Sequence, residues 1–306
     1  MKEYTALSPK MAINLMAPHT WPASIMPCLL AICICSVDMG GVNMMLSFFL
    51  LVICIAMQAS VNVFNDYFDY VKGLDSTEDN LDPDDNVLPY YHVNPQHALM
   101  LAVALLVIAF VIGIYLILLA GIAPLIIALI GAAIVVLYSG GKTPISYLPI
   151  GEFVSGFVMG GLIPLGVCSV LLPAIDYWIL IKSIPLIISI GLIMQTNNTC
   201  DIDKDMGVGR KTLPCKIGRK ASKKLYNILI LVSMIASGII VAAWYTEGIW
   251  LIIIMYVAVF PVVKGMFKNP LLPQTRIPAM SAVCAFNLVE GAFLCAAVLG
   301  SLLPII

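Results

Sequence analysis

The chain has 306 residues, of which 61% are hydrophobic and 11% are charged, and its mean hydropathy is +1.02. Soluble domains carry about 25% charged residues and 45–50% apolar ones, so this chain has too few polar side chains to cover a soluble globule. The composition therefore excludes a soluble protein, a disordered protein and a nucleic-acid-binding protein with a broad basic face. It predicts a polytopic membrane protein with a single domain over residues 1–306.

Apolar segments of about 20 residues, the length that crosses roughly 30 Å of hydrocarbon as a helix, recur along the whole chain. We therefore predict an all-α protein with nine transmembrane helices. Gly121 alone separates the third helix from the fourth, which predicts a tight antiparallel pair. The expected helices cover residues 16–37, 43–64, 97–120, 122–139, 151–172, 178–198, 223–244, 248–267 and 279–303.

Basic residues are concentrated on one side of this arrangement. Of the 16 lysine and arginine residues, all but Lys182 fall in or beside the N-terminal segment and the loops near 65–96, 140–150, 199–222 and 268–278. By the positive-inside rule, we expect a multi-pass protein of the cell membrane with its N-terminus and these loops in the cytoplasm and its C-terminus outside. Most acidic residues lie on the same side, and this one-sided distribution argues against a cation-coupled transporter.

The end of the second expected helix carries the first of two acidic motifs. Asn65, Asp66 and Asp69 lie close together in the sequence, and Lys72 and Asp75 come next. If the helix continues through them, Asn65 and Asp69 share one face, because residues four positions apart lie on the same side of a helix. A polar stripe at the end of a membrane helix is costly unless it faces a partner or a cavity.

The end of the sixth expected helix repeats the pattern. Asn197, Asp201 and Asp205 are spaced by four residues, so they also share a face. The units Asn65–Asp69 and Asn197–Asp201 are 132 residues and four helices apart. This spacing predicts two four-helix pseudo-repeats of parallel topology plus a ninth helix, arranged around a central cavity.

Two carboxylate clusters suit a hard divalent cation, because Mg2+ is commonly held by one or two carboxylates together with phosphate oxygens of a substrate. Clusters that face each other could hold two Mg2+ ions across a diphosphate group, and the ions would neutralise this leaving group as its bond breaks. Lys72, Lys142, Arg210 and Lys211 would complete the clamp. The alternative, that acidic residues only solvate the rim of the protein, is favoured for Glu78–Asp85 and disfavoured for the two repeated motifs.

These residues resemble the signature of the UbiA superfamily of intramembrane prenyltransferases, over almost the whole chain. The resemblance implies nine helices and Mg2+-dependent transfer of a prenyl group from a polyprenyl diphosphate. It also implies that Tyr138 stabilises an allylic cation, as an aromatic face can, and that Lys142, four residues later, contacts the diphosphate. Together, residues and resemblance predict catalytic roles for Tyr138, Asp69, Asp201 and Asp75, diphosphate binding by Asn65, Lys72, Lys142, Arg210, Lys211, Asn197 and Asn198, and metal binding by Asn65, Asp66, Asp69, Asp201 and Asp205.

Within the superfamily, the chain is similar to the MenA branch, which prenylates the aromatic acceptor 1,4-dihydroxy-2-naphthoate in menaquinone synthesis. Asp75 stands ten positions after Asn65, as in this branch. Two positions depart from it, because Ala17 and Asn86 stand where the branch carries basic residues. Other acceptors, such as 4-hydroxybenzoate or geranylgeranylglyceryl phosphate, therefore stay open, and His19 is a candidate substitute for a missing basic group. The similarity is carried by residues 65–75, 138–152 and 197–214.

Glu290 is an acidic residue inside the ninth expected helix. An intramembrane carboxylate is functional by default, but it could equally be protonated and bonded to a neighbouring helix. Two other functions also stay open: a transporter that uses the acids as ion ligands, and a scaffold with a degenerate site. The one-sided distribution of acidic and basic residues weighs against the transporter, and the intact acidic motifs weigh against the scaffold.

Overall fold

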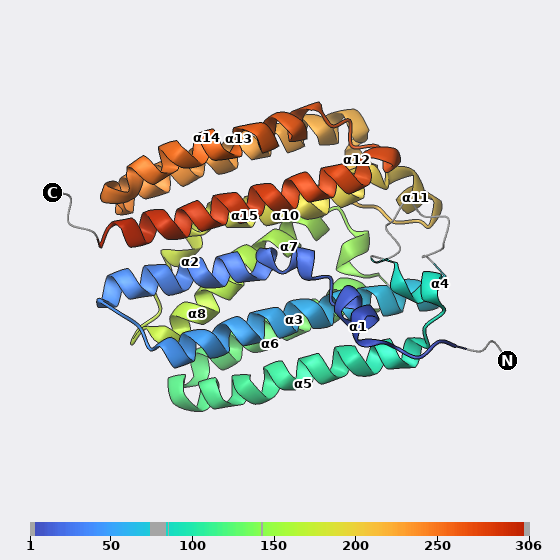
Figure 1. Cartoon of the computed structure of the whole chain (residues 1–306), viewed down its shortest axis with the longest axis horizontal. Coiled ribbons are helices and arrows are strands. Elements are labelled where there is room, and N and C mark those ends of the chain that lie inside the picture. The colour runs from blue at the N-terminus through green and yellow to red at the C-terminus, as the bar shows by residue number, and fades with distance from the viewer. Residues whose placement is uncertain (1–3, 74–83, 85, 142, 303–306) are drawn as a thin grey trace.

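Long helices run side by side along the long axis of the molecule (Figure 1). Among the described residues, the only β-type pairing is an isolated bridge between Thr5 and Val93, so the predicted all-α class is confirmed. Of the expected site residues, Asp75 and Lys142 lie outside the described part of the chain. This computed structural model describes residues 4–73, 84, 86–141 and 143–302.

Seven helical segments of the described chain are long and apolar enough to cross a membrane. The helices α6 (Ile122–Ser139) and α10 (Ile184–Cys200) are shorter, and they lie where the sequence predicts the fourth and sixth spans. The polytopic architecture is therefore confirmed, whereas nine crossings, the two pseudo-repeats and the central cavity stay predictions. The seven segments are Pro22–Met39, Met44–Val71, Pro95–Ala120, Gly151–Leu171, Arg219–Trp244, Thr246–Lys268 and Pro273–Gly300.

These segments contain the long helices of Figure 1, and shorter helices connect them or divide them. The long helices are α2 (Pro22–Met39), α3 (Met44–Val71), α5 (Pro95–Ala120), α13 (Arg219–Trp244), α14 (Ile249–Lys268) and α15 (Arg276–Gly300). The shorter ones are α1 (Pro9–Leu15), η1 (Pro18–Thr20), α4 (Val87–Tyr91), η3 (Ile145–Tyr147), α7 (Gly151–Phe157), the π-helical η4 (Val158–Leu162), α8 (Ile163–Leu171), α9 (Ile179–Lys182), α11 (Ile202–Gly207), α12 (Leu213–Ile217), η5 (Thr246–Gly248) and η6 (Pro273–Thr275).

The helix α3 continues past residue 64, where the sequence predicts the end of the second span. Its N-terminus is capped by Asn43, whose side-chain oxygen accepts hydrogen bonds from the backbone N–H groups of Met45 and Leu46 at 3.0 and 3.2 Å. It ends only at Val71, so the first acidic motif lies on regular helix. Asn65 and Asp69 are therefore one helical turn apart on the same face.

The first span, in contrast, starts later than residue 16. Ala17 has a left-handed backbone with φ of 46°, and the turn η1 follows it before α2 begins at Pro22. Asn62 on α3 fixes this turn, because its amide donates to the carbonyl oxygen of Met16 at 3.0 Å and to the hydroxyl of Thr20 at 2.9 Å. The polar stripe of α3 thus finds its partner in the segment that precedes α2.

A close backbone contact sets the distance between α10 and the segment α7–η4. A Cβ atom at Gly160 would lie 2.5 Å from the backbone nitrogen of Ile187, which no side chain could accommodate without a shift. Glycine at this position lets the two backbones approach. The contact aligns the polar end of α10 with α7, where Glu152 lies.

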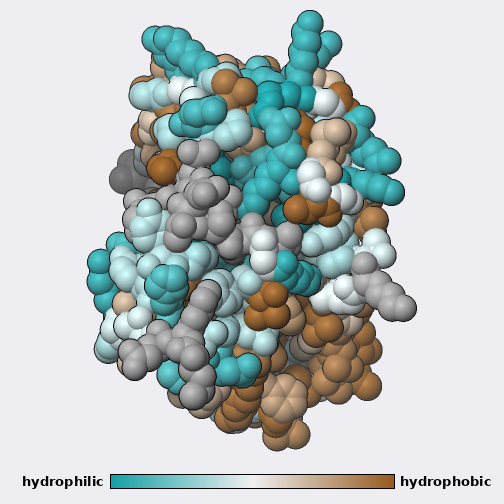
Figure 2. All heavy atoms as spheres, turned by 90° about the vertical axis from the view of Figure 1, so that its right-hand side faces the viewer, coloured by the Kyte–Doolittle hydropathy of each residue, from teal (hydrophilic) through white to brown (hydrophobic). Residues whose placement is uncertain are grey.

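The two ends of the helix bundle differ in polarity. One end carries α4, α11 and α12 (Figure 1), and hydrophilic side chains gather over its upper part (Figure 2). At the opposite end the buried Lys182 forms ion pairs with Asp176 at 3.2 Å and Asp38 at 3.8 Å. The one basic residue expected on that side is therefore neutralised within the protein. Which end faces the cytoplasm stays a prediction.

Glu290 lies on α15 and is 1% exposed. The hydroxyl of Ser233 on α13 donates toward its carboxyl oxygens at 2.9 Å, and that of Ser237 donates to Oε1 at 3.0 Å. This arrangement matches the structural alternative for Glu290, a buried acid that is hydrogen-bonded to a neighbouring helix.

Candidate functional site

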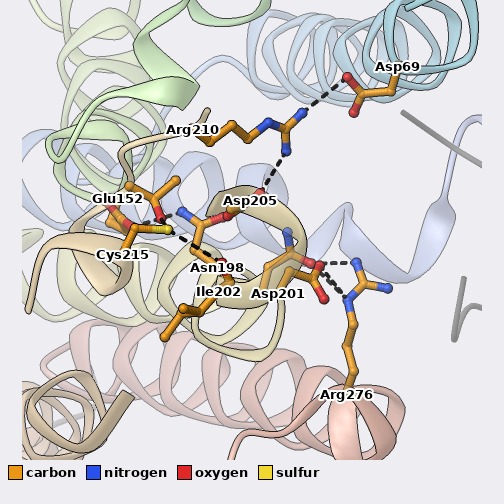
Figure 3. A network of polar contacts seen from close by, with 11 residues as sticks. Asp69, Glu152, Asn198, Asp201, Ile202, Asp205, Arg210, Cys215 and Arg276 are labelled. Atoms are coloured by element: carbon orange, nitrogen blue, oxygen red, sulfur yellow. Dashed lines mark hydrogen bonds and ion pairs between the residues drawn. The ribbon is translucent and has the colours of Figure 1, made fainter. Parts of the chain in front are cut away.

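The two acidic motifs lie at the same end of the bundle, and Arg210 connects them (Figure 3). Its Nη2 atom is 3.3 Å from Oδ1 of Asp69 on α3, and its Nη1 atom is 3.3 Å from Oδ1 of Asp205 on α11. One guanidinium group thus pairs with a carboxylate from each motif. The two motifs therefore lie close enough together for a single arginine side chain to contact both.

Tyr147 provides a platform for the basic residues of this site. The Arg210 guanidinium carbon is 4.8 Å from the centre of the Tyr147 ring, and Nζ of Lys72 is 5.8 Å from the same centre. The backbone N–H of Lys211 donates to the Tyr147 carbonyl oxygen at 2.8 Å. Three residues that the sequence assigns to diphosphate binding therefore converge on the loop that follows α6, and cation–π attraction helps to orient two of them.

Arg276, at the start of α15, holds the second motif from the other side (Figure 3). Its Nε atom is 3.3 Å from Oδ2 of Asp201 and donates to Oδ1 of Asn197 at 3.2 Å. From its position in the sequence, Arg276 is only one of the basic residues near the loop at 268–278. Its role was not visible there because it is 79 positions from Asn197 and no local spacing relates the two.

Glu152 and Asn198 form a buried pair beneath the site. The Asn198 amide nitrogen donates to Glu152 Oε1 at 2.8 Å, and each residue is 6% exposed. The Asn198 amide therefore links α10 to α7 through this hydrogen bond. The expected contact of Asn198 with a diphosphate stays a prediction. Near this pair, the hydroxyl of Tyr138 is buried and makes no hydrogen bond of normal geometry with the described residues. It lies 3.8 Å from where a Cβ of Gly151 would be.

Asp205 has the most unusual environment among the motif acids. It is 2% exposed, and its Oδ2 atom has no hydrogen-bond partner among the described residues. Burial disfavours the charged carboxylate and raises the pKa of Asp205 to about 6, although the neighbouring Arg210 opposes this shift. Asp205 Oδ2, buried and outside the ion pair with Arg210, is a suitable oxygen ligand for a cation.

The remaining ligands fit a hard cation in their chemistry. Asn65 and Asp66 are half-buried on the last turns of α3, before Asp69. Carboxylate and amide oxygens are the ligands that Mg2+ accepts in proteins. Within the described residues, no three His, Cys, Asp or Glu side chains are grouped closely enough to hold a metal by themselves. Here Arg210 and Arg276 provide the positive charge between the motif acids.

The two positions that lack the basic residues of the MenA branch flank this end of the fold. Ala17 begins the turn η1, and Asn86 is 4% exposed just before α4. Their consequence for acceptor choice stays a prediction.

Comparison with known sequences gives consistent matches over most of the chain. Residues 24–289 match the UbiA prenyltransferase family. The 1,4-dihydroxy-2-naphthoate octaprenyltransferase of Bacillus subtilis is 31% identical over 288 residues, which cover 91% of this chain and 88% of that protein. UbiA prenyltransferase domain-containing protein 1 of Xenopus tropicalis is 26% identical over 95% of this chain and 83% of its own length.

Solved structures share the fold at low sequence identity. A UbiA homologue from Archaeoglobus fulgidus, bound to GPP and Mg2+, superposes with a TM-score of 0.63 at 13% identity and covers 93% of this chain and 99% of that one. A digeranylgeranylglyceryl phosphate synthase matches with a TM-score of 0.60 at 22% identity, over 95% of this chain and 98% of that one. These likenesses concern the helical architecture alone.

Proposed function

Because this chain belongs to the UbiA prenyltransferase family, we propose that it transfers a polyprenyl group to 1,4-dihydroxy-2-naphthoate in menaquinone biosynthesis, with two Mg2+ ions as cofactor. The chain is an integral membrane prenyltransferase. The observation that carries the finer proposal is the meeting of two Asn-plus-Asp motifs at one end of the bundle, joined by Arg210. The naphthoate acceptor is supported by the 31% identity to the Bacillus subtilis enzyme of that name.

The motif residues are the proposed metal site. Asn65, Asp66 and Asp69 on α3, with Asp201 and Asp205 after α10, would hold the ions through their oxygen atoms. When bound, Mg2+ would neutralise the diphosphate and so lower the barrier to breaking the bond between the prenyl carbon and oxygen. Asn65 and Asp69 share a helical face, which allows both to act on one ligand.

The basic residues would hold the diphosphate itself. Arg210 forms ion pairs with Asp69 and Asp205, 3.3 Å from each. A substrate phosphate would offer this guanidinium a stronger bidentate partner. Lys72 shares the Tyr147 platform with Arg210 and would add a second cation on the same side. Lys142 is assigned to the same task, and Asp75 to a catalytic role, from the sequence alone.

The reaction we propose proceeds through ionisation of the donor. The carbon–oxygen bond of the polyprenyl diphosphate breaks, with its electron pair staying on the departing diphosphate, and an allylic cation remains. Tyr138, at the end of α6, is the aromatic residue assigned to stabilise this cation. The electron-rich acceptor ring then attacks the cation and loses a proton, and a dihydroxynaphthoate acceptor also loses CO2. The apolar helices around the site keep out water, which would otherwise quench the cation.

The experiment that tests the proposal incubates the purified protein with geranylgeranyl diphosphate and a panel of acceptors, with and without Mg2+, and identifies products by mass spectrometry. The panel contains 1,4-dihydroxy-2-naphthoate, 4-hydroxybenzoate and geranylgeranylglyceryl phosphate. A prenylated naphthoquinol formed only with Mg2+ and dihydroxynaphthoate is the expected result. Product from another acceptor would reject the naphthoate proposal and keep prenyl transfer, and would point to Ala17 and Asn86 as the cause.

A further inference from the structure

A groove of about 480 Å³ lies on the outside of the bundle between the adjoining ends of α13 and α14. It contains none of the residues of the candidate site, which lies on α3, α10 and α11. The groove is lined by Lys220, Lys223, Lys224, Asn227, Ile228, Leu231 and Phe267.

Positive charge dominates this part of the surface. Neither α13 nor α14 contains an aspartate or a glutamate, while α14 adds Lys264 and Lys268 at the same end. Lys220 and Lys224 are exposed, and neither forms an ion pair with any residue that the structure describes. Hydrophilic side chains gather over this region of the polar end in Figure 2. The groove therefore presents unneutralised cations.

Lys223 is held in place within the groove. Its ammonium group donates to the carbonyl oxygen of Met266 on α14 at 2.7 Å and lies 4.9 Å from the centre of the Tyr226 ring. These contacts tie the two helices together beneath the exposed lysines. The third charge of the groove is thus fixed in position, whereas those of Lys220 and Lys224 stay free to close on a ligand.

The lining changes from charged to apolar along the helix axis. Lys220, Lys224, Ile228 and Leu231 follow at helical spacing and form one stripe on α13. Ile228 lies about 12 Å and Leu231 about 16 Å beyond Lys220, at 1.5 Å per residue. Both are about half exposed, at 46% and 48%, in a segment long enough to cross the membrane. With α13 across a membrane, this stripe would place the lysines at the membrane surface and Ile228 and Leu231 in the hydrocarbon region.

We propose that this groove binds an anionic phospholipid, with its phosphate among the three lysines and an acyl chain along Ile228 and Leu231. Basic pockets between transmembrane helices at the membrane surface suit acidic lipid head groups. A polyprenyl diphosphate has a similar shape, but as a Mg2+ complex it needs carboxylate ligands, and neither helix of the groove carries one. The inference is independent of the proposed acceptor.

The test measures binding of dioleoylphosphatidylglycerol to the detergent-purified full-length chain by native mass spectrometry, with dioleoylphosphatidylcholine as the neutral comparison. The double variant K220Q/K224Q removes the two unpaired cations. At about fivefold per lysine, we expect it to bind phosphatidylglycerol about 30-fold more weakly. K10Q removes an exposed lysine elsewhere on the polar end and should bind as the wild type does. I228W fills the apolar part without changing charge and should also weaken binding.

Four results would overturn the proposal. Equal binding of the two lipids, or wild-type affinity in both K220Q/K224Q and I228W, would exclude a specific anionic-lipid groove. Displacement of the lipid by an equal concentration of inorganic phosphate would show a simple anion site. Displacement by an equal concentration of geranylgeranyl diphosphate, together with a raised KM for this substrate in K220Q/K224Q, would make the groove an entry site for the prenyl donor instead.

Discussion

Arg210 Nη2 lies 3.3 Å from Asp69 Oδ1, although the two residues are 141 positions apart in the chain. The same guanidinium contacts Asp205, so one cation serves a carboxylate from each acidic motif. A buried carboxylate without a counter-charge is costly, and Arg210 provides that charge for the buried Asp205. Burial alone would lower the pKa of Arg210. The neighbouring acids, Asp69 foremost, raise it, and the net shift is upward.

The first prediction concerns this dual role of Arg210. If it neutralises the motif acids without ligand and contacts the diphosphate with ligand, R210Q should strengthen Mn2+ binding to the substrate-free protein. The same variant should lower kcat/KM for the prenyl diphosphate about 10- to 100-fold, because a charge-assisted hydrogen bond is lost. Electron paramagnetic resonance of Mn2+ titrations and steady-state kinetics measure the two effects.

The matched control for R210Q is K268Q, which removes an exposed cation at the same end of the protein. It should change neither Mn2+ affinity nor kcat/KM. Weaker Mn2+ binding by R210Q would contradict the competition between arginine and metal. An unchanged kcat/KM would remove Arg210 from the diphosphate site.

The second prediction concerns Arg276, which holds Asn197 and Asp201 and does not itself belong to either motif. Residues that orient metal ligands typically contribute about 10- to 100-fold to metal affinity or activity. We expect R276Q to raise the Mg2+ concentration needed for half-maximal activity by this factor, with a smaller effect on kcat at saturating Mg2+. R276K should recover part of the loss. An R276Q variant with normal Mg2+ dependence would show that Asn197 and Asp201 need no orientation.

The sequence was sufficient to predict the apolar helices and the two acidic motifs, because both depend on local patterns. Run length decides whether a segment can cross the membrane, and a spacing of four places Asn65 and Asp69 on one face. Arg276 and Glu152 were missed as site residues because their partners, Asn197 and Asn198, are 79 and 46 positions away. Such contacts depend on which helices pack together, and no residue spacing reports this.

Local sequence patterns also do not predict where two of the helices begin or end. The run of apolar residues in α3 gives way to polar ones near residue 64, yet the helix continues to Val71 because its polar face contacts other parts of the protein. The expected first span loses its first residues to the turn at Ala17. In both places, contacts with other segments decide where the helix begins or ends.

The third prediction concerns the close contact at Gly160. A Cβ there would lie 2.5 Å from the backbone nitrogen of Ile187, so G160A forces the segment α7–η4 away from α10. Overpacking of this kind costs about 1–3 kcal/mol. We expect a lower thermal unfolding temperature in detergent, and reduced activity, because the shift separates Glu152 from Asn198. G166A is the control, since a Cβ at Gly166 would meet only Ile127 at 3.5 Å.

If G160A and G166A unfold at the same temperature as the wild type, the close helix contact contributes nothing measurable to stability. A lower unfolding temperature for G166A, with an unchanged one for G160A, would show that the tight helix contact is near Gly166 and not at Gly160.

The fourth prediction decides between the two interpretations of Glu290. Its carboxyl group contacts Ser233 and Ser237, and no hydrogen bond joins it to those motif acids that the structure describes. E290Q keeps a hydrogen-bonding group of the same size and should retain activity and stability. E290L leaves both hydroxyls without this partner and should destabilise the protein by about 1–2 kcal/mol, the scale of hydrogen bonds between membrane helices.

Thermal unfolding in detergent and prenyl transfer at low temperature measure the two effects separately. Loss of activity in E290Q at normal stability would show that Glu290 acts as a functional acid. Normal stability in E290L would show that the network does not lock α15 to α13.

The central claim is that carboxylates from both motifs act together on one Mg2+-bound diphosphate. The most direct test measures diphosphate release from geranylgeranyl diphosphate, with acceptor and Mg2+ present, for the wild type, D69N, D201N and D203N. Asp203 is the matched control, because its side chain is 83% exposed and pairs with Arg219 instead of the candidate site. We predict that D69N and D201N each lose at least about 100-fold in rate while D203N matches the wild type. Near-normal release by either D69N or D201N, in protein with an unchanged unfolding temperature, would contradict the claim.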